Sequence, residues 1–146
     1  MKQIDIFYAD DDDDDLMFFA EAFEKISNES EEKINLHLHR NGENLIENIT
    51  SKNTSGFVLL DINMPFKSGF ELLEEIRKNP VTENFPVIMY STSSNRDYID
   101  KSKILGANLY IIKPYEFAKL FTLIASIIKI DWDNLQAEAD NFPYHY

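Results

Sequence analysis

Five short apolar runs, separated by segments with helical spacing, constrain the fold of this chain more than any other feature. Four runs are continuous and one alternates with polar residues. They span residues 4–9, 34–40 (the alternating run), 56–62, 85–91 and 108–114. Runs this short and this rich in Ile, Val, Phe and Tyr are typical of strands buried on both faces. The pattern predicts a sheet with both faces covered.

Between the runs, apolar residues recur at the three- and four-residue intervals of an α-helix with one buried face. The first such face consists of Leu16, Phe19, Ala20, Phe23 and Ile26. Ser68 and Glu71 have the spacing of a capping box, and Pro80 ends the helix that follows. Strands that alternate with helices predict an α/β fold, (βα)5, with an open, mainly parallel sheet and right-handed crossovers.

Polar or charged residues stand at the predicted carboxyl ends of four strands, where open parallel sheets bind their ligands. These residues are Asp10 and Asp11, Asp61, Ser91 and Lys113. Carboxylates about 4 Å apart repel by roughly 4 kcal/mol per pair at an effective dielectric near 20, and a divalent cation removes that cost. Oxygen ligands without Cys or clustered His favour Mg²⁺ or Mn²⁺ over zinc. We therefore expect a site for Mg²⁺ and a phosphoryl group.

Six consecutive aspartates, residues 10–15, follow the first run. Carboxylates at a helix N-terminus accept hydrogen bonds from free N–H groups and meet the positive end of the helix dipole, so we assign Asp12 to Asp15 to helix capping. Asp10 and Asp11 are the expected metal ligands. A slip of one residue in the strand end would make that pair Asp11 and Asp12 instead.

Charge and composition exclude several classes of partner. A net charge of -12 disfavours nucleic acid and anionic membranes. The absence of Cys excludes disulfides, and residues 1–10 contain no apolar signal region. The longest apolar stretch, residues 120–130, is too short for a membrane span and contains Lys129. We expect a cytoplasmic protein.

Four motifs, in this order on this strand pattern, carry a family resemblance: ADDD, LLDINMP, MYST and IIKP. Together they resemble the receiver domain of two-component response regulators. The resemblance covers residues 3 to about 130. It implies a doubly wound, flavodoxin-like parallel sheet with strand order 2-1-3-4-5.

The resemblance also implies a role for each acidic site residue. Asp61 is the expected phosphoacceptor, which attacks a phosphohistidine on a partner protein. Asp11 and Asp61 are expected to bind Mg²⁺, or Mn²⁺, directly, and Asp10 mostly through water. The backbone carbonyl of Asn63 completes the expected ligand set.

Three further residues match the family's phosphoryl-binding and switching positions. Lys113 is expected to balance the charge of the new phosphate, and the Ser91 hydroxyl to hydrogen-bond one of its oxygens. Tyr110 matches the switching aromatic. Two simpler interpretations stay open: Tyr110 is only a core residue, and Asp61 with Lys113 is only a structural ion pair.

The expected function is that of a stand-alone receiver. It accepts a phosphoryl group from a sensor histidine kinase or a phosphotransfer protein and signals to a downstream protein, without being a turnover enzyme. One alternative is a pseudo-receiver that binds partners without phosphorylation. Another is an aspartate-nucleophile phosphatase of the haloacid dehalogenase type, which requires D-x-D after the first strand, whereas this chain has "DIN" after the third.

The expected domain spans residues 1–130, followed by an extension, residues 131–146, that is too short for a DNA-binding effector. We expect this extension to pack on the domain or on a partner. The last predicted helix has a wide apolar face, which either covers the sheet or forms a homodimer through the fourth and fifth helices. His37, His39 and His145 show no metal or nucleophile spacing, and we assign them no catalytic role.

Overall fold

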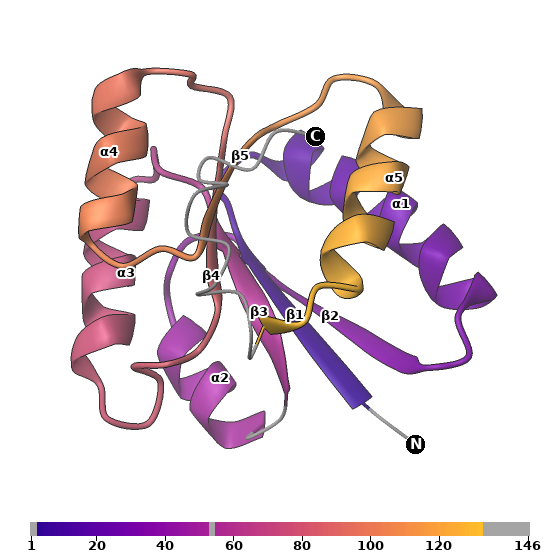
Figure 1. Cartoon of the computed structure of the whole chain (residues 1–146), viewed down its shortest axis with the longest axis horizontal. Coiled ribbons are helices and arrows are strands. Elements are labelled where there is room, and N and C mark those ends of the chain that lie inside the picture. The colour runs from indigo at the N-terminus through magenta and orange to yellow at the C-terminus, as the bar shows by residue number, and fades with distance from the viewer. Residues whose placement is uncertain (1–2, 53–54, 133–146) are drawn as a thin grey trace.

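The computed structural model describes residues 3–52 and 55–132 of the 146-residue chain. In this part of the chain, five strands alternate with five helices (Figure 1). Their bounds are β1 Gln3–Ala9, α1 Asp13–Glu29, β2 Lys33–His39, α2 Leu45–Lys52, β3 Ser55–Leu60, α3 Gly69–Lys78, β4 Val87–Ser91, α4 Arg96–Ile104, β5 Leu109–Ile112 and α5 Phe117–Ile128. Each predicted strand is present, with ends that shift by one or two residues.

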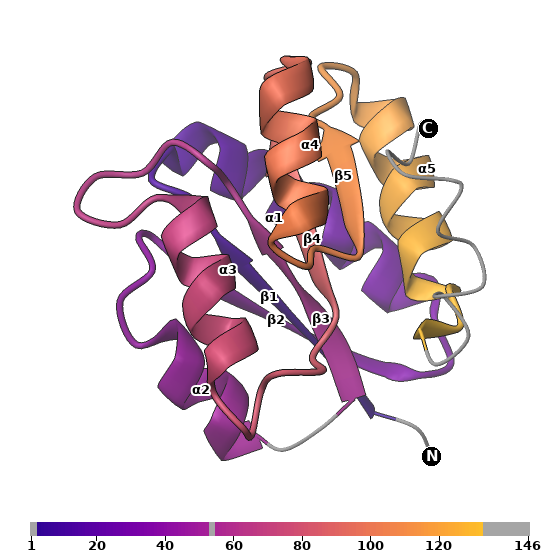
Figure 2. The same cartoon turned by 60° about the vertical axis from the view of Figure 1, so that its left-hand side comes forward.

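The five strands form one parallel sheet in the order β2-β1-β3-β4-β5. Helices α1 and α5 cover one face, and α2, α3 and α4 cover the other, as Figures 1 and 2 show from two directions. The predicted doubly wound α/β fold and its strand order are therefore confirmed. All strand carboxyl ends lie along one edge of the sheet, because every pairing is parallel.

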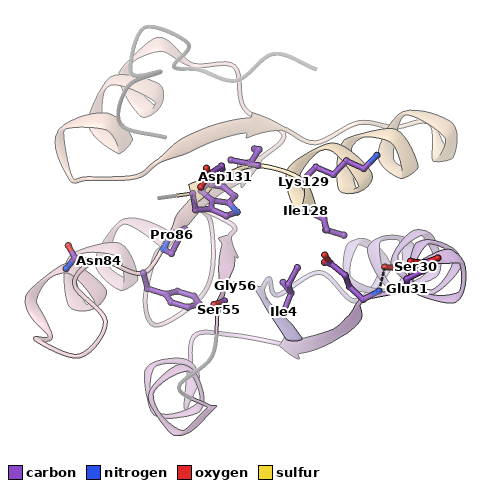
Figure 3. A pocket seen from close by; sticks show the side chains of 14 residues that line it. Ile4, Ser30, Glu31, Ser55, Gly56, Asn84, Pro86, Ile128, Lys129 and Asp131 are labelled. Atoms are coloured by element: carbon purple, nitrogen blue, oxygen red, sulfur yellow. Dashed lines mark hydrogen bonds between the residues drawn. The ribbon is translucent and has the colours of Figure 1, made fainter. Parts of the chain in front are cut away.

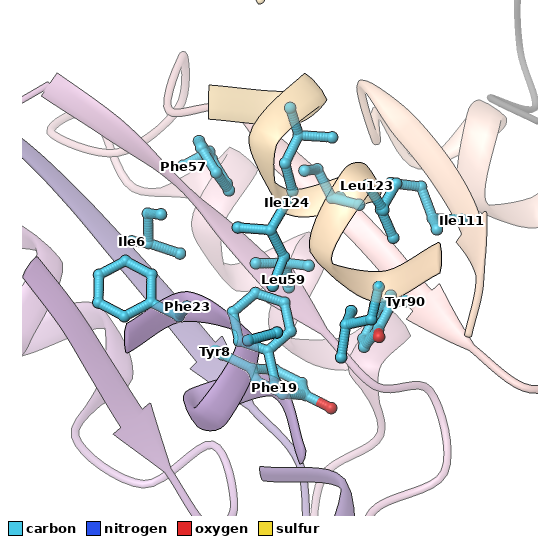
Figure 4. Close-up of a cluster of buried hydrophobic side chains, with 14 of the residues drawn as sticks. Ile6, Tyr8, Phe19, Phe23, Phe57, Leu59, Tyr90, Ile111, Leu123 and Ile124 are labelled. Atoms are coloured by element: carbon cyan, nitrogen blue, oxygen red, sulfur yellow. The ribbon is translucent and has the colours of Figure 1, made fainter. Parts of the chain in front are cut away.

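Alternate residues of each strand enter opposite cores. On the α1 and α5 side, strand residues pack against aromatic and aliphatic side chains of both helices (Figure 4). This cluster includes Ile6, Tyr8, Phe57, Leu59, Tyr90, Phe19, Phe23, Leu123 and Ile124. Burial of one such side chain contributes about 1.5–3 kcal/mol. The other core takes Phe7, Val58 and Leu60 from the intervening strand positions.

The apolar face of α5 mostly covers the sheet. Leu120, Leu123, Ile124 and Ile127 are buried in the first core, whereas Phe117 stays 38% exposed. Covering the sheet is therefore enough to explain the apolar face of α5. A homodimer through α4 and α5 stays a prediction. Within the described residues, no helix is long and apolar enough to span a membrane.

Only the first two residues of the predicted extension, Asp131 and Trp132, lie within the described part of the chain. The Trp132 ring packs against the buried Phe57 ring, with 5.3 Å between their centroids. The start of the extension therefore contacts the domain core. Residues 133–146 lie outside the described residues, and the domain boundary stays a prediction.

Candidate functional site

Four of the predicted site residues gather at the carboxyl edge of the sheet. Asp10, Asp61 and Lys113 each follow directly after a strand, and Ser91 is the last residue of β4. The sheet's hydrogen bonding extends to these positions, since Asp61 N donates to Ala9 O at 3.0 Å and Lys113 N donates to Ser91 O at 2.8 Å. All four residues are at most 8% exposed. The sheet thus holds charged groups in fixed, buried positions.

Gly69 allows the chain after β3 to return close to the site. A Cβ at this position would lie 2.2 Å from the Asp61 carbonyl oxygen, which no side chain tolerates. The Gly69 N–H instead donates to Ile62 O at 2.9 Å, and Ser68 caps α3 by accepting from Glu71 N at 3.2 Å. The predicted capping position is confirmed, and it fixes the loop that follows Asp61.

Three aspartates form a candidate metal site. Asp10, Asp11 and Asp61 each offer a carboxylate oxygen, and these oxygens lie within 4.8 Å of one another. Asp11 is exposed, whereas the other two are buried. A cluster of carboxylate oxygens open to solvent on one side matches the preference of Mg²⁺ or Mn²⁺ for hard ligands plus waters. The donor set therefore fits a divalent ion.

The end of β1 agrees with the first of the two pairs of metal-binding aspartates expected from the sequence, Asp10 and Asp11. Asp12 is the N-cap of α1, and its Oδ1 accepts from Asp14 N at 2.9 Å and Asp15 N at 3.2 Å. It is not among the three clustered aspartates. The capping assignment is confirmed for Asp12, and the alternative pair, Asp11 and Asp12, is not favoured.

Asp10 is fully buried and hydrogen-bonded on both carboxylate oxygens. Its Oδ2 accepts from the Tyr8 hydroxyl at 2.6 Å and from Lys113 Nζ at 2.7 Å, while Oδ1 accepts from Asp12 N at 3.0 Å. Burial, followed by the adjacent Asp10 charge, raises the pKa of Tyr8, so this hydroxyl remains a donor at neutral pH. Donors from three sides keep the carboxylate in place.

Lys113 is the positive centre of the site. Its ammonium donates to Asp10 at 2.7 Å and to Asp15 at 2.9 Å, and lies 3.4 Å from Asp61 Oδ1. Burial alone would lower its pKa, but the hydrogen bonds to Asp10 and Asp15, together with the charges of Asp61 and Asp10, outweigh burial and raise the pKa of Lys113. Lys113 therefore stays charged.

The Lys113 ammonium does not fully balance the negative charge at Asp61. The pKa of Asp61 is raised to about 6, mainly by burial; the Lys113 charge opposes this rise, and the Asp10 charge adds to it. In the described part of the chain, Asp10, Asp11, Asp15 and Asp61 bring four carboxylates to the cluster, whereas Lys113 brings one ammonium. The site has an excess of negative charge that a divalent cation would neutralise.

The remaining predicted residues surround the cluster. Ser91 is buried, and its Oγ accepts from Ser93 N at 3.1 Å. Tyr110 is fully buried in the second core, and its hydroxyl donates to Ser93 O at 2.7 Å. Asn63 is exposed in the loop after Asp61. Tyr110 is thus a core residue that also reaches the β4–α4 loop, so neither interpretation of it is excluded.

Sequence reasoning missed the contact between Asp15 and Lys113, because it assigned Asp15 only to helix capping. The helical period contained the signal. Asp15 lies four residues before the buried Phe19 and seven before the buried Ala22, which places it on the inward face of α1. Asp13, on a different face, forms an exposed ion pair with Arg40, with Nε 2.8 Å from Oδ1.

A cavity of about 910 Å³ opens at the opposite edge of the sheet. Ile4, Ser55 and Pro86, at or just before the amino-terminal ends of three strands, line it together with Ile128 at the end of α5 (Figure 3). Trp132 also lines this cavity. This cavity is separated from the aspartate cluster by the length of the strands. The carboxyl edge, where the charges converge, remains the candidate site.

The comparisons with known proteins agree with this architecture. The family model of the response regulator receiver domain matches residues 6–125. The chain therefore belongs to the response regulator receiver family, a family of two-component signalling proteins.

Two curated relatives show the similarity in sequence. Response regulator Rcp1 of Synechocystis sp. is 39% identical over 70 residues, which cover 48% of this chain and 48% of that protein. Chemotaxis protein CheY-3 of Vibrio cholerae is 38% identical over 64 residues, which cover 44% of this chain and 49% of that protein. The matched stretch spans about half the length of these relatives.

Solved structures share the fold over most of the chain. The Mn(2+)-bound form of Rcp1 aligns with a TM-score of 0.69 and 28% identity, covering 84% of this chain and 90% of that one. A putative response regulator from Chloroflexus aurantiacus aligns with a TM-score of 0.72 and 20% identity, covering 88% and 100%. The second likeness supports the fold alone.

Proposed function

We propose that this chain accepts a phosphoryl group on Asp61 and signals through protein contacts. The observation that carries the proposal is the position of the Asp61 carboxylate: it lies within 4.8 Å of those of Asp10 and Asp11, and its Oδ1 is 3.4 Å from Lys113 Nζ. Phosphoryl transfer requires little beyond such positioning and charge neutralisation. The divalent ion bound by Rcp1 in the related structure gives additional support.

The proposed reaction forms one bond and breaks one. An Asp61 carboxylate oxygen attacks phosphorus, the bond from phosphorus to the donor histidine nitrogen breaks, and the bond's electron pair leaves with that nitrogen. The product is an acyl phosphate on Asp61 and a free histidine on a sensor kinase or phosphotransfer protein. With a small-molecule donor such as acetyl phosphate, acetate is the leaving group.

Each neighbouring side chain has a defined task in this proposal. Asp11 and Asp61 would hold Mg²⁺ or Mn²⁺ directly, Asp10 would do so mostly through water, and Asn63 would contribute its backbone carbonyl. When bound, the ion neutralises charge on the phosphoryl oxygens and on the crowded carboxylates. Lys113, 3.4 Å from Asp61 Oδ1, supplies a further positive charge next to the modified carboxylate.

Ser91 and Tyr110 are proposed to report the modification. The phosphoryl group adds a charge of about -1.5 to -2 and three strong acceptor oxygens, to which the Ser91 hydroxyl donates. Ser93 accepts from Tyr110 and donates to Ser91. A movement of Ser91 is therefore transmitted to Tyr110 through Ser93. The surface formed by the β4–α4 loop and α4 then changes, and a downstream protein binds this surface.

Intact-mass spectrometry after incubation with acetyl phosphate and Mg²⁺ tests this proposal. We expect one phosphate-sized mass gain in the native chain, and none in Asp61→Asn or in the presence of EDTA. Unmodified native protein, also after incubation with a phosphorylated histidine kinase, would favour the pseudo-receiver instead. Sustained hydrolysis of p-nitrophenyl phosphate would favour the phosphatase.

A further inference from the structure

Asp15 shares the Lys113 ammonium with two site aspartates but is not itself part of the metal cluster. Lys113 Nζ lies 2.9 Å from Asp15 and 2.7 Å from Asp10. Asp10 belongs to the group of carboxylates that could hold an ion, whereas Asp15 does not. Lys113 therefore has two partners, Asp10 and Asp61, that it would share with a bound metal, and a third, Asp15, that the metal would leave unchanged.

Burial makes the loss of a partner costly for Lys113. Its side chain is only 8% exposed, so its charge cannot be fully hydrated. The Asp15 side chain comes from the first turn of α1 and is 36% exposed, whereas Asp10 is fully buried. Asp15 is thus placed to hold the ammonium from the solvent side.

We propose, on the basis of the proposed function, that Asp15 is a positioning residue that retains Lys113 when Asp10 and Asp61 are shared with a divalent ion. Without Asp15, Lys113 depends on Asp10 and Asp61 alone. Both of these carboxylates are then shared between the ammonium and the ion. Asp15 thereby favours metal binding without contacting the metal.

Asp14 provides a matched control on the same helical turn. It carries the same charge as Asp15 but is exposed, and in the described structure its side chain contacts no basic group. Asp14→Asn and Asp15→Asn therefore change the net charge equally and perturb the same turn of α1. Only Asp15→Asn removes a partner of Lys113.

Calorimetric titration of the metal-free chain with Mg²⁺, repeated with Mn²⁺, measures the effect directly. We expect Asp15→Asn to bind about 3- to 10-fold more weakly than the native chain, and Asp14→Asn to differ by less than about 2-fold. Asp15→Glu should recover most of the affinity because it restores the carboxylate. Equal behaviour of Asp15→Asn and Asp14→Asn would overturn the proposal.

A double-mutant cycle with Lys113→Met shows whether Asp15 acts through the ammonium. In that background, we expect Asp15→Asn to change the Mg²⁺ affinity by less than about 2-fold. A loss of Mg²⁺ affinity as large as in the native background would mean that Asp15 binds the ion itself or acts on it through its charge alone. Either result would overturn the proposal. The comparison of Asp14 with Asp15 does not depend on the folding of Lys113→Met.

The two proposals fail in different ways. A native chain that binds Mg²⁺ but gains no phosphate would contradict the phosphoacceptor role, while the titrations still decide the role of Asp15. A native chain that binds neither Mg²⁺ nor Mn²⁺ would overturn both the metal site and the role of Asp15.

Discussion

Two buried carboxylates belong to the same short segment of chain and have opposite environments. Asp5 lies inside β1 and is 1% exposed, and its Oδ1 lies 3.2 Å from Asn35 Nδ2 and 2.8 Å from His37 Nε2 on β2. Asp10 follows the end of β1 and is fully buried, but two other carboxylates lie within 4.8 Å. Asp5 meets neighbours that satisfy it, whereas Asp10 accepts hydrogen bonds but also lies beside two carboxylates that repel it.

The difference separates a buried carboxylate with a structural role from one that can bind a cation. Asn35 and His37 stand on the adjacent strand in a fixed register, and the His37 ring stacks on Phe7 with 4.8 Å between centroids. Such a carboxylate stabilises the fold through completed hydrogen bonds. The cluster around Asp10 leaves negative charge uncompensated, and an added cation would remove that cost.

Removal of the Asp5 carboxylate should have the largest effect on stability. Asp5→Ala leaves the Asn35 amide and the His37 ring without this buried acceptor, which we expect to destabilise the chain by about 2–4 kcal/mol. Urea unfolding measures this loss. Asp5→Asn keeps an acceptor oxygen and should be milder. A loss below about 1 kcal/mol, or a changed Mg²⁺ affinity, would contradict the assignment of Asp5 to a structural role.

Removal of the Asp61 charge should have a smaller and opposite effect. The pKa of Asp61 is raised to about 6 from 3.8, so its contribution to stability is present below pH 3.8 and is lost as the pH rises through about 6. At pH 7 without divalent ions, we expect Asp61→Asn to be more stable than the native chain by on the order of 1–2 kcal/mol.

Chemical unfolding of both chains at pH 7 and near pH 4 measures this difference. The gain should shrink at the lower pH, where Asp61 of the native chain is protonated when folded and partly protonated when unfolded. Saturating Mg²⁺ should also reduce the gain at pH 7, because the ion binds the native chain better than the variant. An equal or larger gain near pH 4 would show that the burial of the Asp61 charge and its repulsion by Asp10 are not the source of the gain.

The same contrast explains what the sequence could and could not predict. The strands and the convergence of Asp10, Asp61 and Lys113 follow from apolar runs that end in charged residues, because parallel strands end at one edge. The strand order was implied by the family resemblance. Those signals are local or repeat along the chain. They require no knowledge of which side chains touch across the sheet.

The missed features depend on such contacts. Asp5 stands within a run that we treated as apolar, and its burial is explained only by the register that sets Asp5 opposite Asn35. Asp15 looked like one more capping residue, and its partner lies 98 residues away in sequence. In both cases the sequence identifies an acidic residue but not the side chain that bonds to it.

The smallest effect should come from an exposed member of the same aspartate run. Asp13 pairs with Arg40, but their side chains are 55% and 72% exposed, so water competes for both. We expect Arg40→Ala to leave the unfolding midpoint and the Mg²⁺ affinity unchanged within error. A clear loss of Mg²⁺ affinity would show that the charges at the start of α1 affect the metal site together. It would weaken the distinction between Asp15 and its neighbours.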